Sequence, residues 1–282
     1  MTDYEKKIQF ALKLLRSIPT DEGPVEVAYS TGKDSDVILQ LAKEAGIPYR
    51  AIYKNTTIDR VGSIAHAKEM GVEIVRPKKS FFELVRENGI PSRWYRFCCS
   101  ALKEYKILDR AIMGVRRSES VSRAKRYHEP EECRIYKDKS KVKAYYPILD
   151  WTNEDVERFI KERELKCHPW YYDEEGNFHV ERRVGCMGCP LSGEKGLREQ
   201  FSQYPKLLRL WIKNAQFYLD NHSDTNTAQL FEGNAHNQMF LRLFYPNKCA
   251  DYKAFIGGGI FPELKVDCKA FLEDYFKIDL TI

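Results

Sequence analysis

The segment from Val25 to Val37 constrains the fold of this chain more than any other feature of the sequence. Val25–Tyr29 is short and partly β-branched, which predicts a strand. A polar hexapeptide follows directly, and after it apolar residues recur at helical spacing. A loop between a strand and a helix presents backbone N–H groups and the positive end of the helix dipole, so it is predicted to bind an anion such as a phosphate. The hexapeptide reads Ser30-Thr31-Gly32-Lys33-Asp34-Ser35.

The side chains of this loop favour the same interpretation. Gly32 lets a ligand approach the backbone closely, Lys33 adds a positive charge, and Ser30 and Ser35 add hydroxyl donors. Asp34 and Asp36 either favour the start of the helix or hold Mg²⁺. The alternative is a helix that is merely capped by polar residues. The P-loop pattern G-x-x-x-x-G-K-[ST] is absent from the sequence, so the loop belongs to another class.

Strand and helix patterns alternate beyond this loop. Further strands are predicted over Tyr49–Tyr53 and Val72–Val75 and near Ala111–Val115, with helical patterns between them. Because alternating strands and helices build parallel sheets, the predicted fold class is α/β: a doubly wound, Rossmann-like parallel sheet with a mostly helical C-terminal part.

Two domains are expected in a chain of this length. An α/β domain is predicted at residues 1–150 and a mainly helical region at residues 151–282, which starts with Thr152 as a helix N-cap. The charged and weakly periodic stretch from Arg116 to Lys143 is predicted to be a long loop beside the anion site.

Composition narrows the class of protein. The 43% hydrophobic and 31% charged residues are ordinary for a globular protein, and the net charge of +5 permits an anionic ligand or a nucleic acid without requiring either. The N-terminus lacks the layout of a signal peptide, and no apolar run is long enough for a membrane span. We therefore expect a cytoplasmic enzyme with no membrane partner, in which the eight cysteines are thiols, metal ligands or redox groups.

Four cysteines form two pairs that lie far apart in the sequence, Cys98-Cys99 and Cys186 with Cys189. Thiolates bind Zn²⁺ or an Fe–S cluster. Adjacent side chains on a helix point in different directions, so a [4Fe–4S] cluster with separated corners is preferred over a single Zn²⁺ ion. The alternative is that the first pair is buried as small apolar residues while the second is a redox pair. The remaining cysteines are expected to be free thiols: Cys133, Cys167, Cys249 and Cys268.

The loop resembles the S-G-G-K-D-S loop of the N-type ATP pyrophosphatases, a superfamily that includes the adenylyl-sulfate and phosphoadenylyl-sulfate (PAPS) reductases. Thr31 stands where that pattern has its first glycine, which reduces flexibility. Loops that retain Lys33 and Asp34 resemble the ATP-cleaving branch more than the reductases. The resemblance therefore implies an adenine nucleotide as ligand, with ATP favoured and Mg²⁺ beside it.

Further blocks resemble the same family in the same order, from about Val25 to Leu191. Arg96-Phe97-Cys98-Cys99 followed by Leu102-Lys103 resembles the R-x-C-C and L-K blocks, and Gly114-Val115-Arg116 with Glu119-Ser120 and Arg123 resembles the G-x-R-x-x-E-S block. Pro147–Trp151 resembles P-L-x-D-W, and Arg183–Pro190 resembles the segment that ends in G-C-x-x-C-P. The resemblance implies a [4Fe–4S] cluster, or Zn as the alternative, on Cys98, Cys99, Cys186 and Cys189. It also implies that Arg116, and more weakly Arg123, bind the phosphates.

The activity implied is that of an ATP-dependent, adenylating and pyrophosphate-releasing sulfur-transfer enzyme, with Lys33, Asp34 and Arg116 as catalytic residues. It is similar to the pyrophosphatase component of DNA phosphorothioation systems, which implies a cysteine desulfurase as sulfur donor and DNA or tRNA as acceptor. The first alternative is a sulfonucleotide reductase that produces sulfite, for which Cys268 is the nearest candidate nucleophile, although a buried structural thiol is favoured there. The second is a non-catalytic nucleotide-sensing module. The oligomeric state is not predicted.

Aromatic residues beside the motifs have two interpretations. They either stack on nucleic-acid bases or pack in the core, and packing is favoured. The residues concerned are Trp94, Tyr95, Trp170, Tyr171 and Tyr172.

Overall fold

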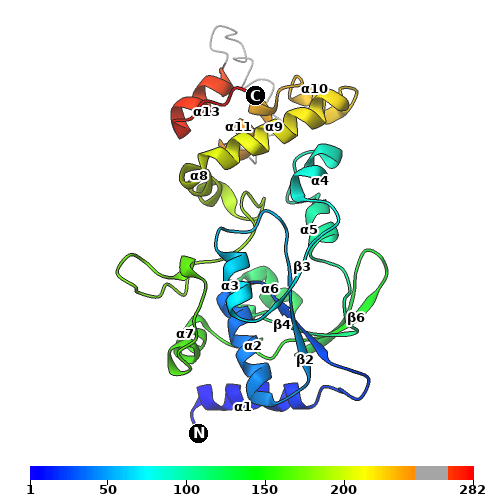
Figure 1. The fold of residues 1–282 in the computed structure, drawn as a ribbon, viewed down its shortest axis with the longest axis vertical. Helices are drawn as coiled ribbons and strands as arrows, with labels where there is room; N and C mark the ends of the chain where they lie inside the picture. The colour runs from blue at the N-terminus through cyan, green and yellow to red at the C-terminus, as the bar shows by residue number, and fades with distance from the viewer. Residues whose placement is uncertain (245–265) are drawn as a thin grey trace. The chain divides into compact units, whose positions relative to one another are not determined.

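The centre of the fold is a six-stranded sheet with the strand order β3-β2-β1-β4-β6-β5 (Figure 1). In this computed structural model, residues 1–244 and 266–282 are described, so Cys249 lies outside the described residues. All neighbouring strands are parallel except β5 and β6, which are antiparallel. The strands are β1 (Val25–Tyr29), β2 (Tyr49–Lys54), β3 (Glu73–Val75), β4 (Arg110–Met113), β5 (Glu131–Ile135) and β6 (Lys141–Tyr145).

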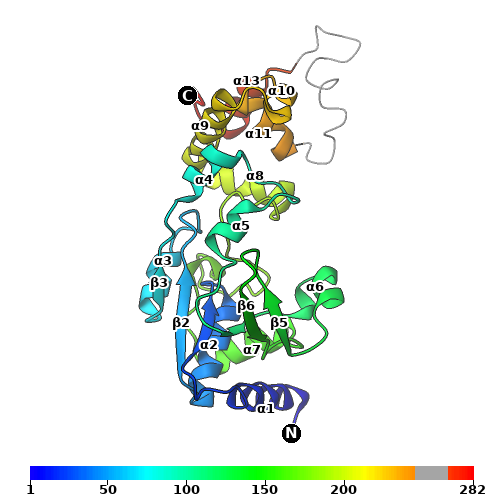
Figure 2. The same cartoon turned by 90° about the vertical axis from the view of Figure 1, so that its right-hand side faces the viewer.

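The apolar character of β1 explains why it lies inside the sheet. Val25 and Val27 have no exposed surface, and β2 and β4 flank the strand on its two sides. Figure 2 shows α3 and β3 at one edge of the sheet and α6 and β5 at the other edge. The prediction of a doubly wound parallel sheet is confirmed for β1, β2, β3, β4 and β6, whereas β5 pairs antiparallel with β6 at the edge.

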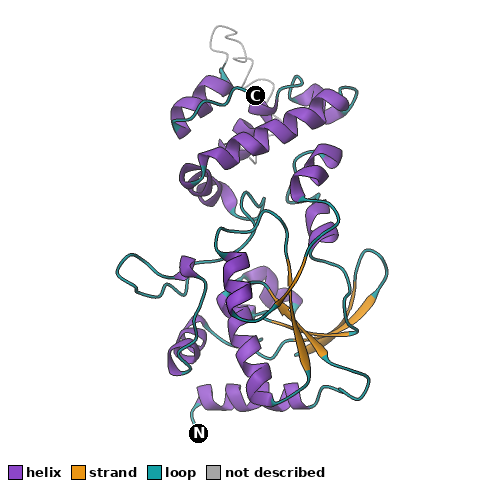
Figure 3. Ribbon diagram, in the orientation of Figure 1, coloured by secondary structure: helices purple, strands orange, loops and turns teal. Residues whose placement is uncertain are grey.

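Helices of the sheet-containing part begin at recognisable caps. In α1 (Asp3–Arg16), Thr2 and Glu5 form a capping box, and Thr152 caps α7 as predicted from the sequence. The helices α1, α2 and α7 pack together against the core of the sheet (Figure 3). The remaining elements are α2 (Lys33–Ala45), α3 (Ser63–Glu69), α5 (Phe97–Leu102), η1 (Arg117–Glu119), α6 (Val121–Arg126), α7 (Asn153–Glu162) and η2 (Pro169–Tyr171).

A second group of helices packs around Trp211, which is 1% exposed. Phe81 and Phe201 lie against its ring, with centroids 4.9 and 6.4 Å away. No helix in the described parts of the chain is long and apolar enough to cross a membrane. The group consists of α4 (Phe81–Asn88), α8 (Gly193–Gln203), α9 (Pro205–Asn221), α10 (Asn226–Leu230), α11 (Ala235–Phe244) and α13 (Cys268–Phe276).

These two groups are the compact units of the chain. The first unit comprises Met1–Pro77 and Cys99–Cys186, and the second comprises Lys78–Cys98 and Met187–Ile282. Each unit is therefore built from two separate stretches of sequence, and each contains one cysteine from each pair. The division into domains at 1–150 and 151–282 stays a prediction.

The stretch from Arg116 to Lys143 differs from its prediction as one long loop. It contains η1, α6 and β5, and it ends inside β6. The sequence signal was weak because β5 is an edge strand whose residues alternate between exposed and half-buried positions, so charged side chains occupy it. The hairpin is fixed by its pairing with β6, from Glu131 opposite Tyr145 to Ile135 opposite Lys141.

Candidate nucleotide-binding site and cysteine motifs

The hexapeptide lies at the carboxyl end of β1, where the order of the strands reverses. The chain passes from β1 to β2 on one side, and β4 occupies the other side of β1. In open α/β sheets, ligands bind in the crevice at such a switch point. The structure therefore places the predicted phosphate loop, Ser30 to Ser35, where this fold binds its ligands.

The backbone of the loop is held in an unusual conformation at Thr31. Its φ angle is 63°, in the left-handed region that favours glycine, and its side chain is fully buried. The Thr31 hydroxyl lies 3.2 Å from that of Ser63, at the start of α3. This contact explains how a threonine is accommodated where the resembling loops have glycine. Gly32 then serves as the N-cap of α2 without a side-chain cap.

Lys33 and Asp34, both predicted to be catalytic, form a close pair at the first turn of α2. The Lys33 side chain is 5% exposed, and its Nζ lies 3.5 Å from Asp34 Oδ2. Burial lowers the pKa of the Lys33 ammonium against the opposing effect of Asp34. An ammonium that has already lost most of its water is positioned to bind an anion strongly.

Arg116 reaches Asp34 from the end of β4. Its Nε donates to Asp34 Oδ1 at 2.7 Å, and its other nitrogens donate to Ser118, to the Trp151 carbonyl and to Asn153. The structure thus places Arg116 beside the loop with protein acceptors at all its nitrogens, and its binding of phosphate stays a prediction. A Cβ on Gly114 would lie 2.9 Å from the Asp34 carbonyl oxygen, which explains the glycine of the G-V-R block.

Arg123 belongs to a wider group of cations around the loop. Glu119 pairs with both Arg123 and Arg183 and is itself 9% exposed. Burial, then Arg183, lowers the pKa of Arg123, and Arg116 contributes to the same effect. The charges of Arg116 and Arg183 also lower the pKa of Lys33. Four cations therefore share one region with two carboxylates.

Arg183 was not identified from the sequence as a site residue. It precedes Cys186 within the same motif block, and its side chain is 62% exposed. The only available signal was its place in that block, because a single arginine in an irregular segment has many surface roles.

A second unexpected partner of the loop is Tyr171. Its side chain is 2% exposed, and its hydroxyl accepts a hydrogen bond from the Lys33 backbone N–H at 3.1 Å. Tyr171 thus occupies one of the amides at the start of α2, and its ring also lies under the Lys33 ammonium, 5.5 Å from the centroid. Of the aromatic residues considered above, Tyr171 is packed as expected.

Asp36 lies beneath the loop and not at its surface. It has no exposed area, and it accepts hydrogen bonds from Tyr29 and His66, the latter at 3.0 Å. Burial, then the neighbouring Asp36 carboxylate, raises the pKa of the Cys167 thiol, which is 3% exposed and so lacks the character of a nucleophile. The hydrogen bonds of Asp36 therefore join α2, directly after the loop, to β1 and to α3.

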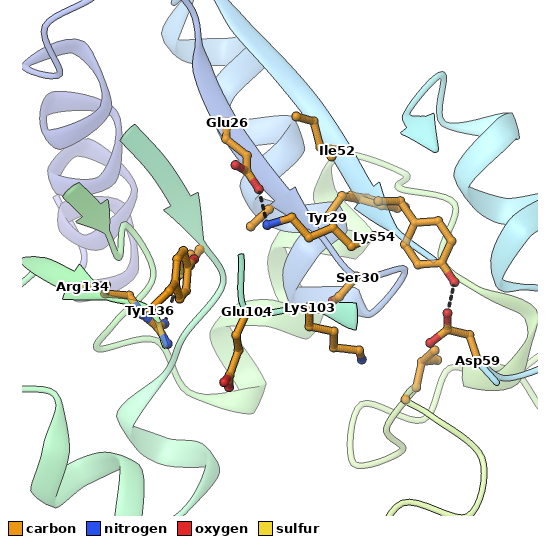
Figure 4. A pocket seen from close by; sticks show the side chains of 15 residues that line it. Glu26, Tyr29, Ser30, Ile52, Lys54, Asp59, Lys103, Glu104, Arg134 and Tyr136 are labelled. Carbon is orange, nitrogen blue, oxygen red and sulfur yellow. Dashed lines mark hydrogen bonds and ion pairs between the residues drawn. The ribbon is translucent and has the colours of Figure 1, made fainter. Parts of the chain in front are cut away.

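A pocket opens beside the loop along the carboxyl ends of β1 and β2 (Figure 4). Glu26 in β1 pairs with Lys54 in β2 at 3.2 Å, and Tyr53 donates to Asp59 at 2.6 Å. The pocket combines apolar and charged walls, as expected of a site for a polar ligand with a flat ring. Its lining includes Glu26, Ala28, Ser30, Ile52, Lys103, Glu104, Met113, Arg134, Tyr136 and Gly185.

In the first unit, Cys99 and Cys186 share a lysine neighbour. Burial alone would lower the pKa of Lys103, but Cys186, Asp59 and Cys99 outweigh it and raise that pKa. Cys186 is also held by short-range contacts, because its Sγ lies 3.4 Å from Thr56 Oγ1 and 3.7 Å from Asp59 Oδ1. A half-buried cation therefore stands beside both motif thiols of this unit.

In the second unit, Cys98 and Cys189 share Arg242 of α11. Burial lowers the pKa of Arg242 to about 10, while Cys189 and Cys98 oppose that shift. Arg242 donates to the Pro91 and Gly188 carbonyls, and its guanidinium lies 4.6 Å from the Trp211 ring centroid. Lys103 was identified from the sequence only as part of a block that follows Cys98-Cys99 and was given no role there. Arg242 was missed, because it lies far from both cysteine motifs in the sequence.

No group of three or more His, Cys, Asp or Glu side chains is arranged to hold a metal ion among the residues that the structure describes. Each unit contributes two of the four motif thiols, and all four are half-buried. Elsewhere, Cys133 is exposed, whereas Cys268 is buried at the start of α13, which confirms the expectation of a buried thiol.

Comparison with known proteins identifies the family. The model of the phosphoadenosine phosphosulfate reductase domain matches residues 24–192. An uncharacterized protein of Methanocaldococcus jannaschii is 28% identical over 218 residues, which cover 71% of this chain and 43% of that protein. Sulfate adenylyltransferase subunit 2 of Shewanella pealeana is 26% identical over 196 residues, covering 57% of this chain and 65% of that protein. The chain spans less than half the length of the archaeal relatives that it matches.

Solved structures show more distant likenesses. The PAPS reductase of Candida auris, in a phosphate complex, is 15% identical with a TM-score of 0.45, covering 67% of this chain and 97% of that one. The U34-tRNA thiolase NcsA of Methanococcus maripaludis, with its [4Fe–4S] cluster, is 17% identical with a TM-score of 0.37, covering 76% and 79%. Because the family model matches more than half of the sequence, the chain belongs to the phosphoadenosine phosphosulfate reductase domain family.

Proposed function

We propose that this protein is an ATP-dependent sulfur-transfer enzyme that cleaves ATP to AMP and pyrophosphate. The observation that carries the proposal is the group of four cations, Lys33, Arg116, Arg123 and Arg183, at the switch point of the sheet. Among the described residues, the carboxylates that form ion pairs with them are Asp34 and Glu119. The excess positive charge suits a polyphosphate.

Each residue of this group has a separate role in the proposal. Lys33 binds the phosphates through its ammonium, and Asp34 positions both Lys33 and Arg116 by pairing with each. Arg123 and Arg183 exchange their bonds to Glu119 for bonds to the triphosphate, assisted by Mg²⁺. Charge that develops on the leaving pyrophosphate is then stabilised by groups fixed in advance.

The four motif cysteines are proposed as the ligands of a cluster, on the strength of their motifs and their cationic neighbours. Cys98, Cys99, Cys186 and Cys189 would hold a [4Fe–4S] cluster, and the positive charges of Lys103 and Arg242 would offset the negative charge of four thiolates. When bound, the cluster supplies a place where sulfide is held or passed on. Zn²⁺ on the same thiolates is the alternative, and iron and sulfide contents separate the two.

The reaction proposed has two balanced steps. An oxygen of the acceptor attacks the α-phosphorus of ATP, which forms the adenylate and releases pyrophosphate. A cysteine desulfurase supplies a persulfide, and two electrons from a thiol reductant release its outer sulfur as sulfide. The sulfide then attacks the activated atom, and AMP leaves with the acceptor oxygen. The acceptor proposed is DNA or tRNA, and the location proposed is the cytoplasm.

The most direct test of the site replaces Lys33 and compares it with a lysine on the exposed side of the same helix. Lys33→Met is expected to weaken ATP binding at least tenfold and to abolish formation of AMP and pyrophosphate, because a desolvated phosphate contact is lost. Lys43 is exposed in α2, so Lys43→Met serves as the matched control with wild-type binding. Unchanged ATP binding by Lys33→Met would refute the proposed site.

Membership of the family favours a second candidate, a PAPS reductase that releases sulfite. Such an enzyme needs an accessible thiol to take sulfite from the nucleotide, and the candidate Cys268 is 2% exposed. Sulfite formation from PAPS that is lost in Cys268→Ser would establish the reductase. A non-catalytic nucleotide sensor is supported instead if Lys33→Ala and Asp34→Ala keep full biological activity.

A further inference from the structure

The segment between α4 and α5 (Figure 1) carries Trp94, whose side chain is almost completely exposed. Trp94 is 97% exposed and Tyr95 is 52% exposed, although packing in the core was favoured for both from the sequence. The other tryptophans differ: Trp151 and Trp211 are each 1% exposed, and Trp170 is half-buried with Arg60 stacked 3.5 Å from its ring centroid. A fully solvated indole leaves a large apolar surface in contact with water, which indicates that it has a partner.

Hydrogen bonds hold the turn, although it is exposed. The Ser92 hydroxyl accepts hydrogen bonds from the backbone N–H groups of Trp94 and Tyr95, at 3.3 and 3.0 Å. The Ser92 N–H in turn donates to the Tyr95 carbonyl at 3.1 Å, and the Arg93 Nε donates to the Pro190 carbonyl at 3.2 Å. An indole presented on a fixed turn loses little conformational entropy when a flat partner stacks on it.

The charge around the turn indicates the chemistry of that partner. Arg93 and Arg96 flank the two aromatic residues and are exposed, and the sequence from Asn88 to Lys103 contains no aspartate or glutamate. Planar aromatic groups between arginines, without acidic residues nearby in the sequence, suit single-stranded nucleic acid, whose bases stack while its phosphates pair with the cations. Trp, Tyr and Arg are also enriched at protein interfaces, so binding of a protein is an outcome that the tests below distinguish.

We propose that the Trp94 turn, Ser92–Arg96, is a stacking platform for a single-stranded or unpaired nucleotide of a nucleic-acid substrate. This proposal rests on the proposed function and names the substrate class: unpaired DNA or RNA. Trp94 precedes Cys98 by four residues, so their Cα atoms are at most about 14 Å apart. A base on Trp94 therefore lies within about four stacked nucleotides of the first cysteine motif.

The first test measures binding of a fluorescein-labelled mixed-sequence 12-nucleotide DNA, and of the matching RNA, by fluorescence polarisation without ATP. Trp94→Ala is expected to weaken binding of one or both by about five- to a hundredfold, and Trp94→Tyr to retain most of it. Phe10→Ala is the matched control, because Phe10 is a half-exposed aromatic residue on α1. Arg93→Ala and Arg96→Ala should each reduce the slope of log affinity against log salt by about one.

A second readout uses the wild-type protein alone. Acrylamide should quench the fluorescence of one solvated tryptophan, and the oligonucleotide should protect it; that quenched component should be missing from Trp94→Phe. The platform would be refuted if Trp94→Ala bound the oligonucleotide as tightly as wild type, or if the oligonucleotide did not protect Trp94 from acrylamide. It would also be refuted if Trp94→Ala lost binding of the desulfurase but kept binding of the oligonucleotide. Oligonucleotide binding without ATP cleavage would refute only the proposed reaction, whereas ATP cleavage without oligonucleotide binding would refute only the platform.

Discussion

At the scale of single residues, Gly188 shows why the second cysteine motif reads C-M-G-C. Its φ angle is 76°, and an added Cβ would lie 2.7 Å from atoms of the Trp211 ring. Gly188→Ala is therefore expected to destabilise the second unit by about 1 to 3 kcal/mol and to lower the iron content. Gly185 meets nothing within 4 Å, so Gly185→Ala should stay within about 0.5 kcal/mol of wild type in urea unfolding followed by circular dichroism. Equal effects of the two substitutions would contradict this account of the motif.

Lys33 gives a prediction about pH. Burial lowers the pKa of its ammonium, so the positive charge is lost at a lower pH than in an ordinary lysine. ATP affinity measured by calorimetry should therefore decline as the pH is raised from about 7 towards about 10. Lys33→Arg keeps its charge over this range and should show a flatter profile, whereas identical profiles would indicate that Lys33 does not contact the nucleotide.

At the scale of elements, His168 at the start of η2 links that segment to α3. Its Nδ1 accepts from the Trp170 N–H at 3.1 Å, and its Nε2 lies 3.5 Å from the Ser63 hydroxyl. Burial, followed by the charges of His66 and Arg60, lowers the pKa of His168 to about 4. The segment is thus held by an imidazole that stays neutral in the folded protein.

This imidazole makes stability depend on pH in a defined window. In the unfolded chain a histidine titrates near about 6.5, so the unfolded state binds the extra proton first as the pH falls. Stability is therefore expected to drop by roughly 1 to 3 kcal/mol between about pH 6.5 and about pH 4, and not between about pH 7 and 8. Urea unfolding of wild type and of His168→Gln at several pH values checks this prediction. The free energy of unfolding of the variant should fall less steeply over this pH range than that of wild type. An equally steep fall in the variant would show that other groups cause the pH dependence.

Elements with strong local patterns could be predicted from the sequence, whereas features fixed by distant contacts could not. The strand at Val25–Tyr29 and the cap at Thr152 carry local signals and were predicted correctly. The edge strand β5 depends on pairing with β6, and Tyr171 reaches the loop from far along the chain. The left-handed backbone of Thr31 was hidden for the same reason, because the contact with Ser63 that accommodates it is not local.

At the scale of the whole molecule, the cysteine pairs are divided between the two units, and this division gives a prediction about metal content. If one cluster takes all four thiolates, then replacing any one by serine should lower iron and sulfide to a similar extent after anaerobic purification. The exposed Cys133 is the control, and Cys133→Ser should keep wild-type contents. Zinc without sulfide in the wild-type protein would contradict a shared [4Fe–4S] cluster. So would a loss of iron and sulfide that follows substitutions in only one of the two cysteine pairs. The substitutions are made in turn at Cys98, Cys99, Cys186 and Cys189.

The central claim, that the loop at the end of β1 positions ATP for cleavage at its α-phosphorus, is tested most directly by identifying the nucleotide products. The anaerobically purified chain is incubated with α-labelled ATP, Mg²⁺, a sulfur donor and DNA or tRNA, and in parallel with PAPS. We predict AMP and pyrophosphate in equal amounts from ATP, no sulfite from PAPS, and no product with Lys33→Met. ADP and phosphate from ATP, or sulfite from PAPS, would contradict the account.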